Sequence, residues 1–283
     1  MLEFPESFRF PINEPIDNLV SWMIQNWSGF FNAIVGIILT LFRGVETALG
    51  LIPWWVLVIG LFIAGWRLYN LKTGVVLSAM LIAIGLFGLW GLMIYTLVIV
   101  IISVLVSILM GLPLGILMAK SDIMKRIMMP ILDAMQTMPS FVYLLPAVMF
   151  FGFGRVPAII ATTTYAIAPL IRLTYLGIST VNHEVIEAGK SFGSTPRQML
   201  LKIELPQSLA SIMTGINQTT MMAMAMVVIA SMIGAEGIGE QVLIAIRRLE
   251  VGNGFQAGLG IVFLAIILDR VLQGFATKLK ERA

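Results

Sequence analysis

Apolar residues run in long stretches along most of this chain, and such stretches predict membrane-spanning helices. A transmembrane helix needs about 20 mostly apolar residues. Seven stretches approach or meet that length: 54–70, 74–93, 96–119, 141–154, 156–177, 209–234 and 256–277. The stretch 141–154 is short, and Gly152, Gly154 and Pro157 interrupt the pattern after it. We therefore expect one or both spans beside this break to be tilted or covered by other protein.

The segment Phe30–Leu51 has two interpretations, because it is long enough to span but carries Arg43 and Glu46. Its polar and small residues recur every three or four positions, which places them on one helical face: Asn32, Gly36, Thr40, Arg43 and Thr47. Such a pattern is typical of an amphipathic helix lying in the membrane interface. An interfacial helix is our expectation, and an eighth span is the alternative.

Composition identifies an integral membrane protein, with 59% hydrophobic residues, 12% charged residues and a mean hydropathy of +0.97. Soluble domains have about 25% charged residues. There is no cysteine, which excludes disulfides, thiol catalysis and cysteine metal sites, and the single histidine, His183, leaves no zinc constellation. No carboxylate pair lies inside a span, so we expect no catalytic residues and no metal site in this chain.

Glycine patterns give no nucleotide site. The phosphate-binding pattern GxxxxGK[ST] is absent, so ATP must be handled by another polypeptide and no cofactor is expected here. The Gly-x-Gly pairs at Gly152 and Gly237 lie in membrane loops and not after strands, and we interpret them as turn formers.

The basic residues occur singly between apolar runs, although the sequence pI is about 9.3. They form no patch that would bind nucleic acid, and we interpret them as topology signals. With seven spans and the N-terminus outside, the cytoplasmic side carries Lys72, Lys120, Lys125, Arg126, Lys190, Arg197, Lys202, Lys278, Lys280 and Arg282. The other side carries Arg9, Arg43, Arg155, Arg247 and Arg248. This asymmetry predicts a multi-pass protein of the cytoplasmic membrane, surrounded by lipids, with a cytoplasmic C-terminus.

The N-terminus does not have the pattern of a cleavable signal. Residues 1–17 lack an early apolar core, and their charges are mostly acidic: Glu3, Glu6, Glu14 and Asp17 against Arg9.

A charged, Gly- and Pro-punctuated island stands between two apolar segments at Glu187–Pro206, with the sequence EAGKSFGSTPRQMLLKIELP. It turns at Gly193, and a short helix is expected to restart around Ser194, Thr195 and Pro196, because Ser or Thr supplies an N-cap before a Pro. The island is expected to close at Leu205 and Pro206. The charge asymmetry places it in the cytoplasm, where it would dock a soluble partner.

This island resembles the EAA loop of ABC importer permeases, with one departure at Gly189, where the family more often has Ala. The runs Asp133–Thr162 and Asn217–Glu240, together with the acidic and amphipathic N-terminal extension, look like the membrane subunit of glycine betaine/proline betaine importers. The resemblance covers nearly the whole chain. It implies an all-α type I importer permease fold with a five-span core, which takes up osmoprotectant quaternary ammonium compounds.

The resemblance also implies an organisation and a set of partners. Residues 1–53 would be an extracytoplasmic or interfacial region, 54–95 two accessory helices, 96–277 the core with its coupling loop at 187–206, and 278–283 a cytoplasmic tail. The implied partners are two cytoplasmic ATPase subunits, which bind the ATP and Mg²⁺, a second copy of this chain, and an extracytoplasmic substrate-binding protein.

The candidate coupling residues follow from the match to the loop motif. The structured part would contain Glu187, Ala188, Gly189, Gly193, Leu205 and Pro206. Direct contacts with the ATPase would come from Ser194, Thr195 and Arg197. Glu187 would cap or pair locally to hold the short helix, and Gly193 would supply a backbone shape that a side chain would obstruct. The alternative for Glu187 is a solvated carboxylate with no special role.

Polar and soft side chains inside the spans give tentative candidates for a translocation pathway: Thr163, Asn217, Gln218, Met221 and Met224. Bonding across packed helices explains the polar ones as well as a pathway does. The methionines suit a trimethylammonium lining or a repackable core. The six tryptophans lie in the N-terminal third and suit interfacial anchoring, so no aromatic cage is expected and high-affinity recognition would belong to the binding protein.

Glu236, Arg247 and Arg248 are candidates for docking that binding protein on the outer face, with a plain solvated loop as the alternative.

The implied mechanism is alternating access by a dimer of this chain. A secondary transporter is a competing class, but Arg172, Asp269 and Arg270 are expected toward span ends and not at mid-span. A membrane scaffold is another. Within ABC importers, a permease for choline, carnitine or taurine is the closest alternative.

Overall fold

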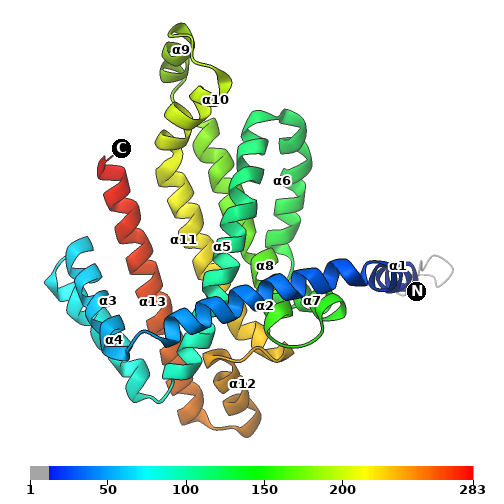
Figure 1. Cartoon of the computed structure of the whole chain (residues 1–283), viewed down its shortest axis with the longest axis vertical. Coiled ribbons are helices and arrows are strands. Elements are labelled where there is room, and N and C mark those ends of the chain that lie inside the picture. The colour runs from blue at the N-terminus through cyan, green and yellow to red at the C-terminus, as the bar shows by residue number, and fades with distance from the viewer. Residues whose placement is uncertain (1–12, 283) are drawn as a thin grey trace, which may run out of the picture.

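The computed structural model describes residues 13–282, and within that range every regular element is a helix (Figure 1). Glu3, Glu6 and Arg9, on which part of the sequence argument about the N-terminus and topology rested, lie outside the described residues. So do Ala283 and the side chains of Lys280 and Arg282.

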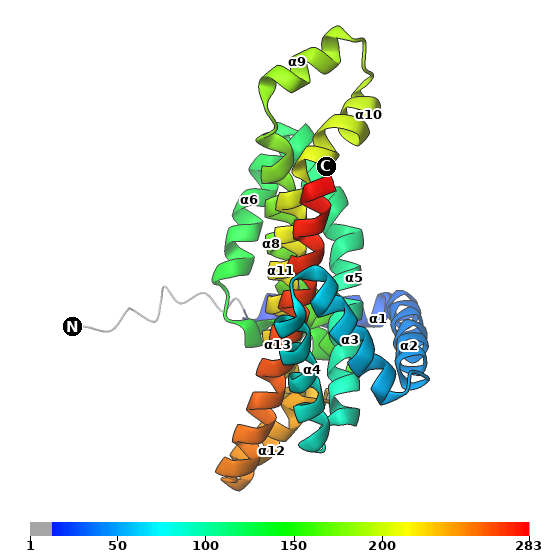
Figure 2. The same cartoon turned by 90° about the vertical axis from the view of Figure 1, so that its left-hand side faces the viewer.

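Two helices form the N-terminal region, α1 (Asn13–Asn26) and α2 (Ser28–Gly50). By length and composition α2 could cross a membrane. It lies crosswise over the long helices of the bundle, however, and Figure 2 shows it nearly end-on beside them. Its apolar face packs on the bundle through Phe31, Ile38 and Phe42. This crosswise orientation favours the interfacial helix over an eighth span.

A tight hairpin follows, made of α3 (Trp54–Leu68) and α4 (Leu71–Leu86). Its helices approach closely because Gly65 and Gly74 meet: a Cβ built on Gly65 would lie 2.8 Å from the Cα of Gly74. Asn70 caps α4 by accepting from the Thr73 amide at 2.9 Å. The predicted boundary between the spans 74–93 and 96–119 is wrong, since the chain turns at Gly88, where φ is +72°.

The core consists of α5 (Trp90–Lys120), α8 (Arg155–Ser179), α11 (Leu205–Ala230) and α13 (Val251–Arg282). The most buried of these is α8, which packs between α5 and α11. Small residues permit the close approach. A Cβ on Gly115 of α5 would lie 2.6 Å from Thr174 of α8, and one on Gly177 of α8 would lie 2.8 Å from Ser211 of α11.

The span predicted at 141–154 is wrong. The chain instead forms α6 (Asp122–Thr137), a 3₁₀ turn η2 (Ser140–Tyr143) and the short α7 (Leu144–Phe151), with a bend of 111° between α6 and the rest. The sequence pattern concealed α6 because its charged residues lower the local hydropathy. The expected irregularity near this break is real, but it lies before α7 as well as after it. Pro139 stands at the bend.

The two ends of the bundle carry different short elements. At one end project α9 (His183–Ser191), α10 (Pro196–Met199) and the π-helical turn η3 (Leu200–Glu204), and α13 ends on the same side (Figures 1 and 2). At the other end lie the 3₁₀ turn η4 (Ser231–Ile233) and α12 (Ile238–Arg248). Among the described residues, five helices are long and apolar enough to cross a membrane, or six if the bent pair is one span. This count leaves out α3 and α4, which have only 15 and 16 residues, and the broken segment at 141–154, and it includes α2, which was not among the seven predicted crossings.

Candidate functional site

The predicted coupling island projects from the bundle as α9 and α10 (Figure 2). The first helix starts at an Asn182 N-cap, whose side chain accepts from the Glu184 amide at 2.9 Å. Glu187 is exposed, and its carboxylate lies 3.3 Å from the Nδ1 atom of His183, one turn earlier. The expected local pairing of Glu187 is therefore present. Ala188 is exposed beside it.

Gly189 faces the opposite way and is buried. A Cβ at this position would lie 2.8 Å from the Cε atom of Met199 and 2.6 Å from the Cδ1 atom of Ile203. An Ala at this position would require the ends of these two flexible side chains to shift. Without a side chain, α9 packs directly on the segment that leads into α11.

The turn between the two helices is a Schellman motif. Gly193 has φ +72° and donates its amide to Lys190, while the Ser194 amide bonds to the Gly189 carbonyl at 3.1 Å. A Cβ on Gly193 would meet nothing within 4 Å. The constraint on Gly193 is therefore its left-handed backbone and not a shortage of space within this chain.

The predicted helix restart is confirmed. Thr195 caps α10, with its hydroxyl accepting from the Gln198 amide at 3.3 Å, and the Gln198 side chain accepts from the Thr195 amide at 2.9 Å. Pro196 occupies the first helical turn. Arg197 is exposed and Ser194 is half-buried.

The segment ends at Leu205 and Pro206, where α11 begins, but no loop separates the two. These residues form the first turn of α11, and the helical backbone continues into them from Pro196 through the π-helical turn. A proline is tolerated there because Pro206 lies at the start of the α-helical segment, and the preceding wider turn relieves its missing amide. The coupling segment is thus a direct extension of a core helix.

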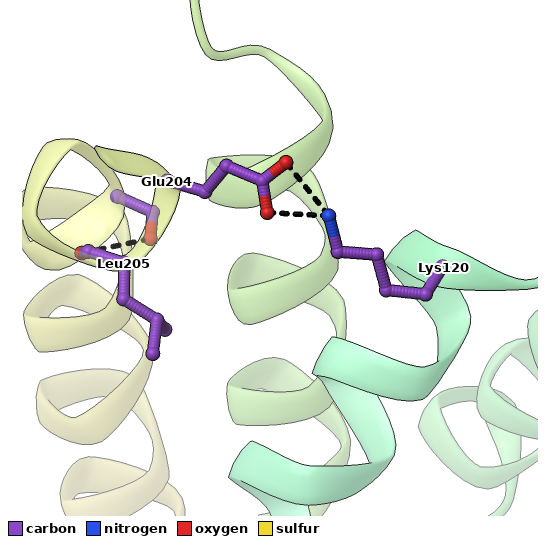
Figure 3. A network of polar contacts seen from close by, with 4 residues as sticks. Lys120, Glu204 and Leu205 are labelled. Atoms are coloured by element: carbon purple, nitrogen blue, oxygen red, sulfur yellow. Dashed lines mark hydrogen bonds and ion pairs between the residues drawn. The ribbon is translucent and has the colours of Figure 1, made fainter. Parts of the chain in front are cut away.

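Sequence reasoning missed a buried ion pair at the base of this segment (Figure 3). Glu204, in the π-helical turn, is 5% exposed, and both of its carboxylate oxygens accept from the Nζ atom of Lys120, with the Oε1 contact at 2.7 Å. Lys120 is the last residue of α5. The pair ties the start of α11 to the end of α5. No sequence signal joins two residues 84 positions apart.

Phe192 is the second residue that the sequence reasoning missed. It follows α9 directly and is 90% exposed, the largest value among the exposed large hydrophobic residues. An isolated apolar residue on a surface needs no explanation by itself. Here it stands at the tip of a projecting segment, and a phenylalanine among the polar and small residues of 187–198 was the signal that could have found it.

The structure separates the five pathway candidates. Thr163 and Met224 are buried within the chain, and the Thr163 hydroxyl donates to the Ile159 carbonyl at 2.8 Å. Asn217 donates to Asp269 of α13 at 2.8 Å, which is a bond between packed helices. These placements favour packing roles. Gln218 is exposed and Met221 is half-buried, so they remain the candidates with access to an open path.

The docking candidates lie at the end of the molecule opposite the coupling segment. Glu236 is exposed and pairs with Arg155 at 3.0 Å, and the Arg155 guanidinium also lies over the rings of Phe42 and Tyr95. Arg247 and Arg248 are exposed at the end of α12. Glu236 is therefore not a plain solvated loop residue, because it belongs to a cluster that joins α2, α5 and α8.

Comparison with known proteins adds independent information. Residues 111–282 match the model of the family described as binding-protein-dependent transport system inner membrane component. The chain is 46% identical to the glycine betaine/carnitine transport permease protein GbuB of Listeria monocytogenes, over 98% of this chain and 99% of that one. It is 42% identical to the glycine betaine transport system permease protein OpuAB of Bacillus subtilis, over 97% of each chain.

A solved structure with the same fold is the inward-facing MetNI methionine ABC transporter. The match has a TM-score of 0.60 at 18% identity and covers 65% of this chain and 93% of that one. At this identity the similarity concerns the fold alone. The expected type I importer permease fold is confirmed.

Proposed function

Because this chain belongs to the family of binding-protein-dependent transport system inner membrane components, we propose that it is the membrane-spanning permease of an ATP-driven importer for glycine betaine. The similarity to glycine betaine permeases over nearly its full length carries this proposal. ATP would be hydrolysed by separate cytoplasmic subunits, and an extracytoplasmic protein would deliver the solute.

The projecting segment Glu187–Pro206 is proposed as the contact with the ATPase. Three features support it. Schellman and capping-box bonds give the segment a defined shape, so little order has to be gained on binding. Phe192 is available as an apolar anchor. Glu187, Ala188 and Arg197 offer polar and small contacts around it.

The continuous helix from Pro196 into α11 suits the transmission of movement. A displacement of α10 must move the start of α11, because no flexible loop separates them. In the proposed mechanism ATP binding closes the ATPases, the projecting segments move with them, and two copies of the core open outward. The partner must bind the two states with different affinity, since equal affinity would shift no equilibrium.

Uptake of radiolabelled glycine betaine tests the proposal. Proteoliposomes would contain this chain with its ATPase partner and binding protein, with and without internal ATP. ATP-dependent uptake that unlabelled glycine betaine competes, and taurine does not, is the expected result. ATP hydrolysis without glycine betaine uptake would retain the importer class and exclude this substrate, and carnitine and choline would then be the next solutes to measure.

A further inference from the structure

An ion pair joins α6 and α8 far from either end of the bundle. Arg172 donates to Asp133 through its Nη2 atom. Asp133 lies eleven residues after the start of α6, and Arg172 lies seven residues before the end of α8. At 1.5 Å per residue these positions are about 16 Å and 10 Å from the helix ends on the side of the coupling segment. Arg172 thus lies toward one end of the 25-residue α8, as the sequence placed it, but well inside that end.

Both charges are accessible on the surface of the single chain. The side chain of Asp133 is 63% exposed and that of Arg172 is 35% exposed. In a hydrocarbon core about 30 Å thick, charged side chains at such a depth face other protein or a water-filled cavity, because facing lipid is costly. The face of α6 that carries Asp133 is accordingly not a lipid face. In a permease, this face must then border either the path of the solute or the second copy of the chain that completes the path.

The neighbourhood of the pair contains further polar and aromatic groups. Gln136 and Thr137 are exposed in the next turn of α6. Tyr143 donates to the Met135 carbonyl at 2.6 Å and packs edge-on against Tyr165, with ring centroids 5.8 Å apart. Tyr165 precedes Arg172 by seven residues, so the two share one face of α8. The two tyrosine rings thus lie on the side of the ion pair that is away from the coupling segment.

We propose that Asp133 and Arg172 form a binding site on the translocation path for a zwitterionic solute. The carboxylate of the solute would bind the Arg172 guanidinium, whose planar donors match a carboxylate. The quaternary ammonium, which has no hydrogen to donate, would lie against Asp133 and the aromatic rings. This inference rests on the proposed function and specifies where in the chain that solute is recognised.

When the site is empty, the Nη2 atom of Arg172 donates to Asp133 and its buried Nε atom has no partner. A bound zwitterion supplies one charge to each side chain. Neither state then leaves a charge unpaired. Binding breaks the hydrogen-bonded Arg172–Asp133 pair, and this loss offsets part of the attraction gained, because the ammonium group makes no hydrogen bond to Asp133. Such an exchange keeps binding weak. Weak binding is what a transport path requires, since the solute has to leave as readily as it enters.

Uptake kinetics of the complete transporter test this site. Asp133→Asn and Arg172→Gln each remove one charge-assisted contact, and we expect the maximal uptake rate to fall about tenfold or more. The KM for uptake should change less than twofold, because the binding protein captures the solute. Arg126→Gln, which removes a charge from the exposed first turns of the same helix, is the control and should transport normally.

The double variant Asp133→Leu with Arg172→Met distinguishes a structural role of the pair from a role in binding solute. Replacing an ion pair with apolar residues of similar size commonly preserves or increases stability. If the pair only holds α6 against α8, this double variant will transport at the normal rate, which would overturn the proposal. If the pair binds solute, the double variant will be present at normal level and will remain inactive, while its ATPase still hydrolyses ATP.

A second readout uses the absence of cysteine from the chain. Gln136→Cys should react with a water-soluble thiol reagent bearing a trimethylammonium group, and glycine betaine should slow the reaction. Ile63→Cys on α3, across the bundle from α6, is the lipid-facing control (Figure 1). Equal reaction rates at the two positions would overturn the proposal.

The outcomes separate this site from the proposed substrate. If the unmodified complex hydrolyses ATP but takes up no glycine betaine, the proposed substrate is wrong, and so is the proposed binding site for it. If the unmodified complex takes up glycine betaine and Asp133→Asn and Arg172→Gln do so equally well, only the site is wrong.

Discussion

Two of the ion pairs between helices of this bundle differ in what surrounds the carboxylate. Glu204 is buried, with its side chain 7% exposed, and its charge is met by Lys120 from another helix. Asp133 also meets a cation from another helix, but its side chain is 63% exposed. The first pair lies at the base of the coupling segment, and the second lies deep along the helices.

The difference shows how the same chemistry serves two purposes. A buried carboxylate that loses its cation has no water to replace it, so the Lys120–Glu204 pair fixes α11 to α5. An exposed pair gains little from its own attraction and can exchange it for another partner. The Lys120–Glu204 pair should therefore hold structure, and the deeper pair should be open to a ligand.

Lys120→Met should have the largest effect on stability. It leaves the Glu204 carboxylate buried without its cation, at a cost of roughly 3 kcal/mol. Glu204→Gln should cost less, because Lys120 is 42% exposed and can remain hydrated. Thermal unfolding of the purified complex measures both. Equal destabilisation by the two variants would contradict the interpretation of Glu204 as a carboxylate that depends on Lys120.

Phe192→Ser tests whether the coupling segment also carries binding energy. Burying a phenylalanine side chain contributes about 2 kcal/mol, so loss of the anchor should weaken ATPase binding roughly 30-fold. A pull-down titration of the ATPase against the purified chain measures the change. Val251→Ser, which removes an 85% exposed apolar residue at the other end, is the matched control. Equal affinities for both variants would exclude Phe192 from the contact.

Gly193→Asp should leave the protein folded and abolish uptake. Its φ of +72° costs a non-glycine residue about 1 kcal/mol, and the new charge stands at the proposed ATPase contact. Gly88→Asp is a close control, because Gly88 has the same φ and also has open space around it, but it lies in the α4–α5 turn. Uptake by Gly193→Asp at normal protein level would exclude the coupling assignment.

Asp133→Asn should have the smallest effect on stability, about 0.5 kcal/mol, since the carboxylate is mostly exposed. Its unfolding temperature should match the unmodified complex within a degree or two. A loss of stability as large as that caused by Lys120→Met would mean that both ion pairs stabilise the fold equally, and the contrast between them would be wrong.

Much of the fold and of the coupling segment was predictable because its signals are local. The capping box at Thr195 and the turn at Gly193 depend on residues three to five positions apart, and these interactions form as the sequence pattern predicts. The amphipathic pattern of α2 predicted an interfacial helix for the same reason. The sequence-based predictions were wrong at α6, where polar residues interrupt an apolar run, and at the α4–α5 boundary, where a turn interrupts one.

The sequence by itself determined the membrane class, most of the long helices and the shape of the coupling segment, because hydrophobic periodicity and helix capping act within a few residues. Only the tertiary structure decided which charges meet, how the chain bends by 111° after α6, and that α10 continues into α11. Lys120 and Glu204 are 84 positions apart, and Asp133 and Arg172 are 39 apart. Such pairs depend on how helices pack, and no local pattern contains that information.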